Sequence, residues 1–132
     1  MIWHPELSII LTKDIGEGCT IHAPVWIGRD VKIGKNVKIQ AFAFIPDGVT
    51  IKDNCFIGPH TCFGNDLHPP SGKKNHIKTL VKKGASVGMN ATIIPGVTIG
   101  EGAMVGGGAV VVDDVESDIT VVGNPAHKIN EK

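Results

Sequence analysis

Isoleucine recurs at every sixth position through the first half of this 132-residue chain. The spacing holds for nine isoleucines in succession, Phe63 continues it, and valine and isoleucine resume it in phase after a break. A period of six fits neither the 3.6-residue period of an α-helix nor the simple alternation of a strand. The positions are Ile9, Ile15, Ile21, Ile27, Ile33, Ile39, Ile45, Ile51 and Ile57, and then Val81, Val87, Ile93, Ile99, Val105 and Val111.

A second set of smaller residues lies four positions after these large ones, as Val31 follows Ile27 and Ala91 follows Val87. Gly and Asn fill many positions between the two sets, and both tolerate the positive φ of tight turns. Each hexad therefore predicts a short strand and a turn, with both apolar side chains pointing inward. Three hexads close one triangular coil, so residues eighteen apart stack at a strand spacing of ~4.8 Å.

Composition limits the class of protein. The length fits one domain over residues 1–132, and a formal net charge of zero gives no basic surface for nucleic acid. Seventeen Gly and an aromatic content of 5% indicate an aliphatic core with many turns. No apolar run is long enough to cross a bilayer, and no signal segment precedes the repeats, so we expect no membrane insertion. Three Cys, an odd number without metal-ligand spacing, favour reduced thiols and a cytoplasmic location.

The hexads resemble those of the hexapeptide-repeat acyltransferase family, whose fold is a left-handed parallel β-helix. Segments such as Ile27–Lys32 (IGRDVK) and Val87–Thr92 (VGMNAT) show the pattern, and the resemblance covers about residues 9–126. It implies an all-β, single-stranded left-handed parallel β-helix, the hand following from the resemblance alone. Complete hexads predict about five coils, with a C-terminal extension over about residues 117–132.

The resemblance also implies a homotrimer around a threefold axis, with a monomer carrying capped ends as the alternative. Five aromatic residues are interpreted either as outward contacts for partner subunits or as caps of the prism. They are Trp3, Trp26, Phe42, Phe44 and Phe56.

The repeat is interrupted once. Positions 69 and 75, where the next large aliphatic residues are due, hold Pro69 and Asn75, and Pro69 is followed by Pro70. Consecutive prolines cannot donate to a central strand ladder, so about residues 66–78 are predicted to leave the coil as an extruded loop. Long loops that interrupt a rigid scaffold usually carry function.

The run from Ile57 to Pro69 (IGPHTCFGNDLHP) is similar to that of nucleotide-linked amino-sugar N-acetyltransferases of this family. These carry Asn-Asp followed shortly by an aromatic residue and Pro, which implies that Asn65 lies beside the sugar amine. His68 stands where the aromatic residue is common, and His-Pro is similar to the sugar O-acetyltransferases, whose catalytic base is such a His. The resemblance further implies that the loop reaches a neighbouring subunit and covers the acceptor end of an acyl-CoA site.

The chemistry of acyl transfer suits these residues. An attacking hydroxyl needs a general base such as neutral imidazole, whereas an amine needs positioning and a path for its proton. His68 and Asn65 are therefore the predicted catalytic residues, with His60 and Asp66 on the substrate side. Structural roles stay open as alternatives: His68 packs the loop against Pro69, Asn65 and Asp66 close its start, or Asp66 holds the tautomer of a nearby His.

Acetyl-CoA is the expected co-substrate. In relatives it contacts the third residue of two hexads eighteen positions apart, which implies Met89 and Gly107 here. The Gly-Asn-Pro-Ala run at 123–126 borders the adenine in relatives, which implies Pro125. Asp113, Asp114 and His127 replace residues that include the family's usual cations, and Lys128, or Lys82 and Lys83, are candidates to compensate.

No metal site is predicted. His60, His68 and His76 are eight residues apart, unlike the zinc ligands of carbonic anhydrases with this fold. The hypothesis is an acetyl-CoA-dependent N-acetyltransferase acting on the amino group of a nucleotide-linked amino sugar. The alternatives are a sugar O-acetyltransferase, a γ-carbonic-anhydrase-like zinc enzyme and a non-catalytic trimeric scaffold.

Overall fold

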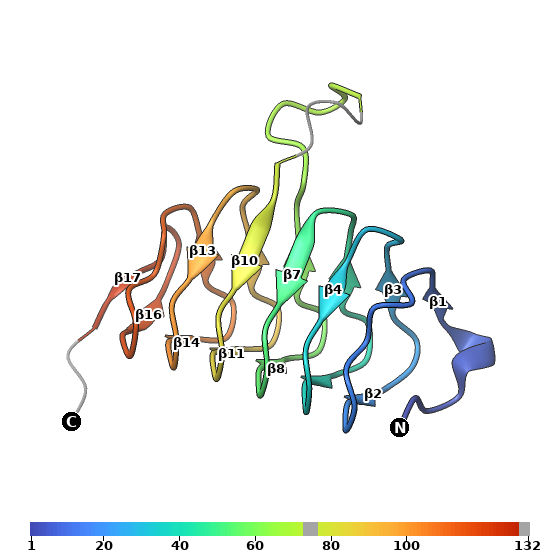
Figure 1. Ribbon diagram of the computed structural model, residues 1–132. Helices are drawn as coiled ribbons and strands as arrows, with labels where there is room; N and C mark the ends of the chain where they lie inside the picture. Colours follow the sequence, from blue (N-terminus) through green and yellow to red (C-terminus); the bar gives the residue numbers. More distant parts are fainter. Residues whose placement is uncertain (73–76, 130–132) are drawn as a thin grey trace.

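The structure is a computed structural model that describes residues 1–72 and 77–129 (Figure 1). A short 3-10 helix, η1 (Pro5–Leu7), precedes a series of strands of two or three residues that form three sheets. Sheet 1 comprises β2 (Thr20–Ile21), β5 (Lys38–Ile39), β8 (Phe56–Ile57), β11 (Ser86–Val87), β14 (Met104–Val105), β16 (Thr120–Val122) and β17 (His127–Lys128). Sheet 2 comprises β1 (Ile9–Ile10), β3 (Trp26–Ile27), β6 (Phe44–Ile45), β9 (Cys62–Phe63), β12 (Thr92–Ile93) and β15 (Val110–Val111). Sheet 3 comprises β4 (Lys32–Ile33), β7 (Val49–Ile51), β10 (Thr79–Val81) and β13 (Thr98–Ile99).

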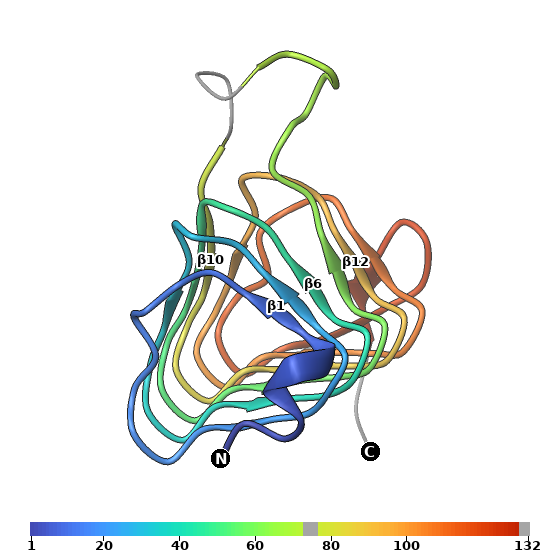
Figure 2. The same cartoon turned by 90° about the vertical axis from the view of Figure 1, so that its right-hand side faces the viewer.

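The chain visits sheets 1, 2 and 3 in turn, so each circuit makes one triangular coil of a parallel β-solenoid (Figure 2). The register is that of the repeat, because Ile27 pairs with Ile45 and Ile39 pairs with Ile57, each eighteen residues on. Within residues 1–72 and 77–129, all strand pairs are parallel except β16 with β17. The solenoid has three corners, named here the 1–2, 2–3 and 3–1 corners after the sheets that they join.

Burial follows the hexad. The large aliphatic residues from Ile21 to Val111 are almost inaccessible to solvent, and Phe63 takes its predicted place among them. The smaller set fills the remaining core, as Val37 and Ala91 do with no exposed surface. Removing such a side chain from water contributes about 1.5–3 kcal/mol for a Val or Ile. The predicted all-β solenoid is therefore confirmed.

The two ends of the solenoid depart from the prediction. At the N-terminal end Ile10, rather than Ile9, pairs with Ile27, and Ile9 is 52% exposed. The reason is a connection one residue shorter, since Ile15 follows Ile10 after five positions. At the C-terminal end Val115 bridges to Ile99, sixteen residues away. These partial coils bring the solenoid to about six turns, instead of the five that complete hexads predict.

The predicted extruded loop is confirmed. The chain leaves the solenoid at the 2–3 corner after β9 and returns at β10, and the described residues between these strands project well beyond the coils (Figure 1). Strand pairing then resumes at once, with Thr79–Val81 aligned on Val49–Ile51. Within residues 1–72 and 77–129, no helix has the length and apolar character needed to cross a bilayer.

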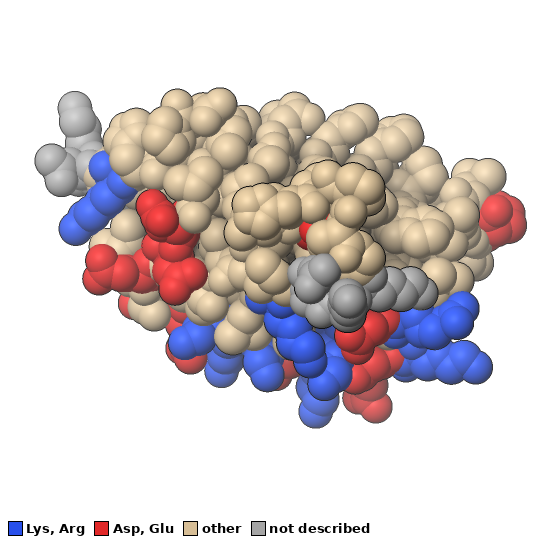
Figure 3. Space-filling model, turned by 90° about the horizontal axis from the view of Figure 1, so that it is seen from above, with Lys and Arg blue, Asp and Glu red and all other residues tan. Residues whose placement is uncertain are grey.

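The 3–1 and 1–2 corners differ in charge. The third residue of the hexad is charged in successive coils of the 3–1 corner, at Lys35, Asp53, Lys83 and Glu101. The matching residues of the 1–2 corner are Ala41, Pro59, Met89 and Gly107. The outward residues of sheet 2 are also uncharged: Ile9, Trp26, Phe44, Cys62, Thr92 and Val110. Figure 3 shows most of the charged side chains along one long side of the molecule, with smaller groups at its two ends.

Candidate active site

The base of the loop is held by Asn65. Its side-chain amide nitrogen donates a hydrogen bond of 2.9 Å to the backbone carbonyl of Asp47, one coil earlier on the same corner. Its own backbone carbonyl accepts a hydrogen bond of 2.9 Å from the N–H of Ile77 on the returning limb. Asn65 is half-buried and joins both limbs of the loop to the solenoid, so its side chain has a fixed orientation.

Asp66 organises the start of the loop. Its carboxylate accepts hydrogen bonds from the backbone N–H groups of Ser71, at 2.8 Å, and of His68, at 3.3 Å. The hydroxyl of Ser71 also donates to this carboxylate. These contacts fold residues 66–71 into a compact turn, which is the structural role considered for Asp66 from the sequence. The substrate role of Asp66 stays a prediction.

His68 lies on the exposed part of this turn, three residues after Asn65. Its backbone is fixed by Asp66, while its side chain faces solvent. The two predicted catalytic residues therefore share one loop, with Asn65 at the base and His68 farther out. His76, the third histidine of the eight-residue series, lies outside the described residues.

The predicted cofactor contacts lie on the 1–2 corner. Met89 is 59% exposed, and its carbonyl accepts a hydrogen bond of 2.8 Å from the N–H of Gly108 in the next coil. A Cβ on Gly107 would lie 3.3 Å from Cγ of Met89, so a glycine keeps this corner narrow. Neither the N–H of Met89 nor that of Gly107 donates to any residue of the described ranges. On the 3–1 corner the matching N–H of Lys35 donates to the Asp53 carboxylate at 2.8 Å. The N–H groups of Asp53, Lys83 and Glu101 on that corner have no acceptor among the described residues.

His60 lies on the same corner, one coil before Met89. It adopts a left-handed backbone conformation, with φ of 61°, and its side chain is exposed. The coils are joined here by a hydrogen bond of 2.9 Å from the N–H of Asn90 to the carbonyl of Pro59. The imidazole stacks on Phe42, with ring centroids 4.7 Å apart and an interplanar angle of 11°. The 1–2 corner thus presents Phe42, His60, Met89 and Gly107 in successive coils.

The C-terminal residues close this end of the solenoid. Pro125 follows β16, and the antiparallel strand β17 returns along it, pairing Lys128 with Val121. Pro125 and Lys128 are both exposed, and the imidazole of His127 lies 3.3 Å from the carbonyl of Pro125. The structure places Lys128 at the same end as Pro125. Lys82 and Lys83 lie on the 3–1 corner, across sheet 1 from Met89 and Gly107, so within one chain they cannot compensate there.

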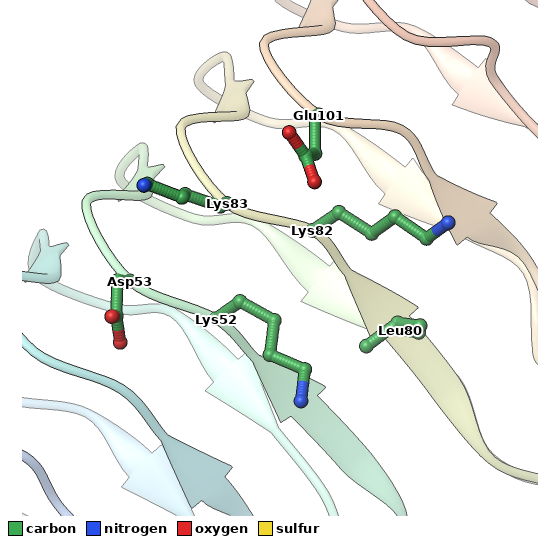
Figure 4. Close-up of a pocket in the computed structure, with 6 residues that line it drawn as sticks. All are labelled: Lys52, Asp53, Leu80, Lys82, Lys83 and Glu101. Carbon is green, nitrogen blue, oxygen red and sulfur yellow. The ribbon is translucent and has the colours of Figure 1, made fainter.

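One groove lies apart from the loop and from the 1–2 corner. It has a volume of about 490 Å³ on the 3–1 corner, and Figure 4 shows the lysine chains of two coils extending along it. Lys52, Asp53, Leu80, Lys82, Lys83 and Glu101 line it. None of these six residues is a histidine, so the predicted imidazoles lie elsewhere, on the loop and the 1–2 corner.

The predicted site residues therefore form two groups. Asn65, Asp66 and His68 lie on the loop at the 2–3 corner, whereas His60 and the cofactor residues lie on the 1–2 corner. Sheet 2 separates the two groups, so a single chain does not bring them together. Among residues 1–72 and 77–129, no three His, Cys, Asp or Glu side chains cluster as metal ligands.

The sequence pattern predicts only a contact or capping role for Phe42. A sharper signal was present, because Phe42 occupies the hexad position that holds Asn36, Asn54, Asn90 and Gly108 in other coils. An aromatic residue at a turn position that favours Asn or Gly is unusual, and this indicates that Phe42 has a role beyond the turn.

Burial raises the pKa of two thiols. Desolvation is the main cause of the raised pKa at Cys55, which lies in the core. Partial desolvation also raises the pKa of Cys62, on the outer face of sheet 2. Neither thiol is therefore prepared as a thiolate nucleophile near neutral pH. This agrees with acyl transfer by direct attack of the acceptor.

Comparison with known proteins identifies the class. The bacterial transferase hexapeptide (six repeats) family matches residues 30–65 and 78–113, which is more than half of the chain. The unmatched residues between these ranges are those of the extruded loop. The chain belongs to this family, and the resemblance seen in the sequence is confirmed.

Individual relatives are acetyltransferases. The chain is 27% identical to a galactoside O-acetyltransferase of Lactococcus lactis, over 98% of this chain and 72% of the relative. It is 53% identical over 49 residues to a dTDP-3-amino-3,6-dideoxy-α-D-galactopyranose 3-N-acetyltransferase of Aneurinibacillus thermoaerophilus, covering 37% of this chain and 26% of that protein. A mutant of the GDP-perosamine N-acetyltransferase of Caulobacter crescentus, solved with CoA and GDP-perosamine, superposes with a TM-score of 0.79 at 29% identity. That match covers 94% of this chain but only 54% of the solved chain.

Proposed function

We propose that this protein transfers the acetyl group of acetyl-CoA to the amino group of a nucleotide-linked amino sugar. The observation that carries the proposal is the single extruded loop, which fixes Asn65 at its base and presents His68 beyond it. The Asn-Asp motif of this loop resembles amino-sugar N-acetyltransferases, and two of the relatives named above act on nucleotide-linked amino sugars.

Acetyl-CoA is assigned to the 1–2 corner. The N–H groups of Met89 and Gly107 lack a protein acceptor within the described ranges, and amide carbonyls of the pantetheine arm are suitable acceptors. The third hexad residues of this corner are uncharged, and Gly107 allows close approach of an extended chain. Pro125 and Lys128, at the C-terminal end, are assigned to the adenine and its phosphates.

The reaction needs little covalent chemistry from the protein. The sugar amine attacks the thioester carbonyl, the carbon–sulfur bond breaks, and CoA leaves as a thiolate that must gain a proton. His68 takes the proton released by the amine and delivers it to the sulfur. Asn65 orients the amine, and positioning of this kind lowers a barrier by several kcal/mol, about 7–11 in the best cases.

The two groups of site residues are united by assembly as a homotrimer. The loop of one copy would extend past its own sheet 2 to the 1–2 corner of the next copy, placing Asn65 and His68 near His60. The uncharged outer face of sheet 2, with exposed Trp26 and Phe44, supports this arrangement because large exposed apolar patches mark interaction surfaces. Such a heterologous contact closes into a ring when the rotation matches.

Sugar O-acetylation is the second candidate. His68 followed by Pro69 is the observation that favours it, because a hydroxyl acceptor requires a base and the exposed imidazole provides one. The similarity to a galactoside O-acetyltransferase also supports a hydroxyl acceptor.

An acceptor panel tests both candidates. Purified protein is incubated with acetyl-CoA and dTDP-3-amino-3,6-dideoxy-α-D-galactopyranose, GDP-perosamine or methyl β-D-galactopyranoside, and free thiol is followed with a chromogenic disulfide. Thiol release with an amino sugar, and a product 42 mass units heavier, is the expected result for one added acetyl group. Release with the galactoside alone would replace the main proposal by the second candidate. Absence of transfer to all three would contradict both.

A further inference from the structure

Phe42 occupies a backbone conformation that its side chain disfavours. Its φ is 68°, in the left-handed region that bulky L-residues rarely adopt. Every other residue with positive φ in the described ranges is Gly, Asn, Asp or His. Strain of this kind persists where the surrounding structure enforces it, and it concentrates at functional sites.

Burial does not explain this choice of residue. The ring of Phe42 is 55% exposed, whereas its neighbour Ala43 is the inward, buried residue. The turn itself is fixed by backbone contacts, including a hydrogen bond of 3.1 Å from the N–H of His60 to the carbonyl of Ala41. An Asn, as found at positions 36, 54 and 90, would satisfy the same backbone at lower conformational cost.

What the ring does contact is His60. The two rings are nearly parallel, at 11°, with centroids 4.7 Å apart, so Phe42 covers one face of the imidazole. No described residue makes a hydrogen bond to the nitrogens of His60, and the 1–2 corner carries no Lys, Arg, Asp or Glu. The stack therefore fixes the plane of the ring while leaving its nitrogen edge for a molecule bound at the corner.

The position of His60 along the corner indicates which molecule that is. Met89 and Gly107, assigned to acetyl-CoA, follow in the next two coils, and Pro125 lies at the far end. Pantetheine running from that end along the corner reaches His60 last, where the thioester meets the acceptor. We infer that Phe42 is a positioning residue, which holds the His60 imidazole so that a ring nitrogen hydrogen-bonds the amino sugar. This inference rests on the proposed function.

The kinetic test uses Phe42→Leu, which keeps an apolar side chain but removes the flat ring. With dTDP-3-amino-3,6-dideoxy-α-D-galactopyranose as acceptor, kcat/KM should fall about tenfold or more, because small displacements at a reacting centre are costly. The KM for acetyl-CoA should stay unchanged, and Phe42→Tyr should restore activity. Leu80→Ala, on the outer face of sheet 3, is the control and should behave like the wild type.

A double-mutant cycle tests whether Phe42 acts through His60. If it does, Phe42→Leu should add almost nothing to the loss caused by His60→Ala, because the ring that it positions is gone. Full additivity of the two losses would overturn the inference. Equal kcat/KM for wild type and Phe42→Leu would overturn it as well, whereas an inactive wild type would instead refute the proposed function.

Two further measurements do not depend on activity. Stacking shifts the ring-proton signals of His60 upfield, and Phe42→Leu should return them toward exposed-histidine values. Phe42→Asn should raise the thermal midpoint by about 2–8 °C through relief of strain, while lowering transfer. A lower midpoint in Phe42→Asn, or unchanged His60 signals in Phe42→Leu, would show that the ring serves stability and not positioning.

Discussion

The side-chain amide of Asn65 donates a hydrogen bond of 2.9 Å to the backbone carbonyl of Asp47, in the coil below the loop. This hydrogen bond joins the base of the extruded loop to the repeating coils of the solenoid. Because the donated hydrogen bond orients the amide, Asn65 has a structural task in addition to its proposed contact with the acceptor amine. Substitutions at Asn65 should therefore affect both stability and catalysis.

Asn65→Ala separates these two effects. Loss of the hydrogen bond to Asp47 should lower the free energy of unfolding by about 1 kcal/mol, the usual value for one such contact. Loss of amine positioning should lower kcat by about a hundredfold. Chemical denaturation and steady-state kinetics measure the two quantities. A variant with the stability loss but unchanged kcat would show that Asn65 only closes the loop.

His68→Gln tests the proton path. His68 is exposed, so its replacement should leave the thermal midpoint unchanged, while kcat should fall by about 10²–10⁴ if the imidazole carries the proton. His4→Gln, at an exposed histidine near the N-terminal end of the solenoid, is the matched control. A loss below about threefold would contradict a role for His68 as base and leave proton removal to the substrate or solvent.

Lys128 and Lys83 offer a matched pair for the cofactor side. Both are exposed, but Lys128 lies at the end that Pro125 closes, and Lys83 lies on the opposite 3–1 corner. Lys128→Ala should raise the KM for acetyl-CoA several-fold and weaken its dependence on salt, because an exposed charge pair contributes roughly 0.2–1 kcal/mol. Lys83→Ala should change neither quantity. A larger effect at Lys83 would contradict this assignment and place the nucleotide part of CoA in the groove lined by Lys82 and Lys83.

Trp26→Glu tests the proposed assembly. Trp26 is 36% exposed on sheet 2 and stacks on Phe44 with centroids 6.3 Å apart, so a carboxylate there would meet the partner's apolar surface. Burial of an unpaired charge is costly, and the trimer should dissociate in sedimentation experiments, with loss of transfer. Lys32→Glu, on the outer face of sheet 3, should leave the oligomeric state intact. Dissociated subunits that retained full activity would contradict a site shared between copies.

The sequence predicted the middle of the fold well because one residue in every six must enter a narrow core. A side chain such as Ile45 can only point into the narrow core of a triangular coil. The six-residue period of the sequence therefore also determines the register in which neighbouring coils pair. The ends follow weaker constraints. Ile9 and Ile10 are chemically equivalent, and the shorter connection to Ile15, which decides between them, leaves no mark in the period.

Site residues in the segment that interrupts the six-residue period could be predicted from the sequence. Site residues that keep the period could not. Pro69 and Pro70 predict the loop, and the motif at its start indicates Asn65 and His68 as site residues. The separation of this loop from Met89 and Gly107 depends on which corner each turn occupies, a three-dimensional property. Phe42 sits in phase with the repeat, so only its backbone conformation and its stack on His60 reveal a role.

The register difference at the N-terminal end can be measured directly. Ile57 is fully buried, and Ile57→Ala should lower the free energy of unfolding by about 2–5 kcal/mol through lost burial and the cavity left behind. Ile9 would be equally sensitive if the period continued to the first coil, but it is 52% exposed, so Ile9→Ala should cost less than about 1 kcal/mol. Ile10→Ala, at the position that pairs with Ile27, should cost more than Ile9→Ala. Urea unfolding of the three variants decides the matter, and the reverse order at Ile9 and Ile10 would restore the unbroken six-residue phase.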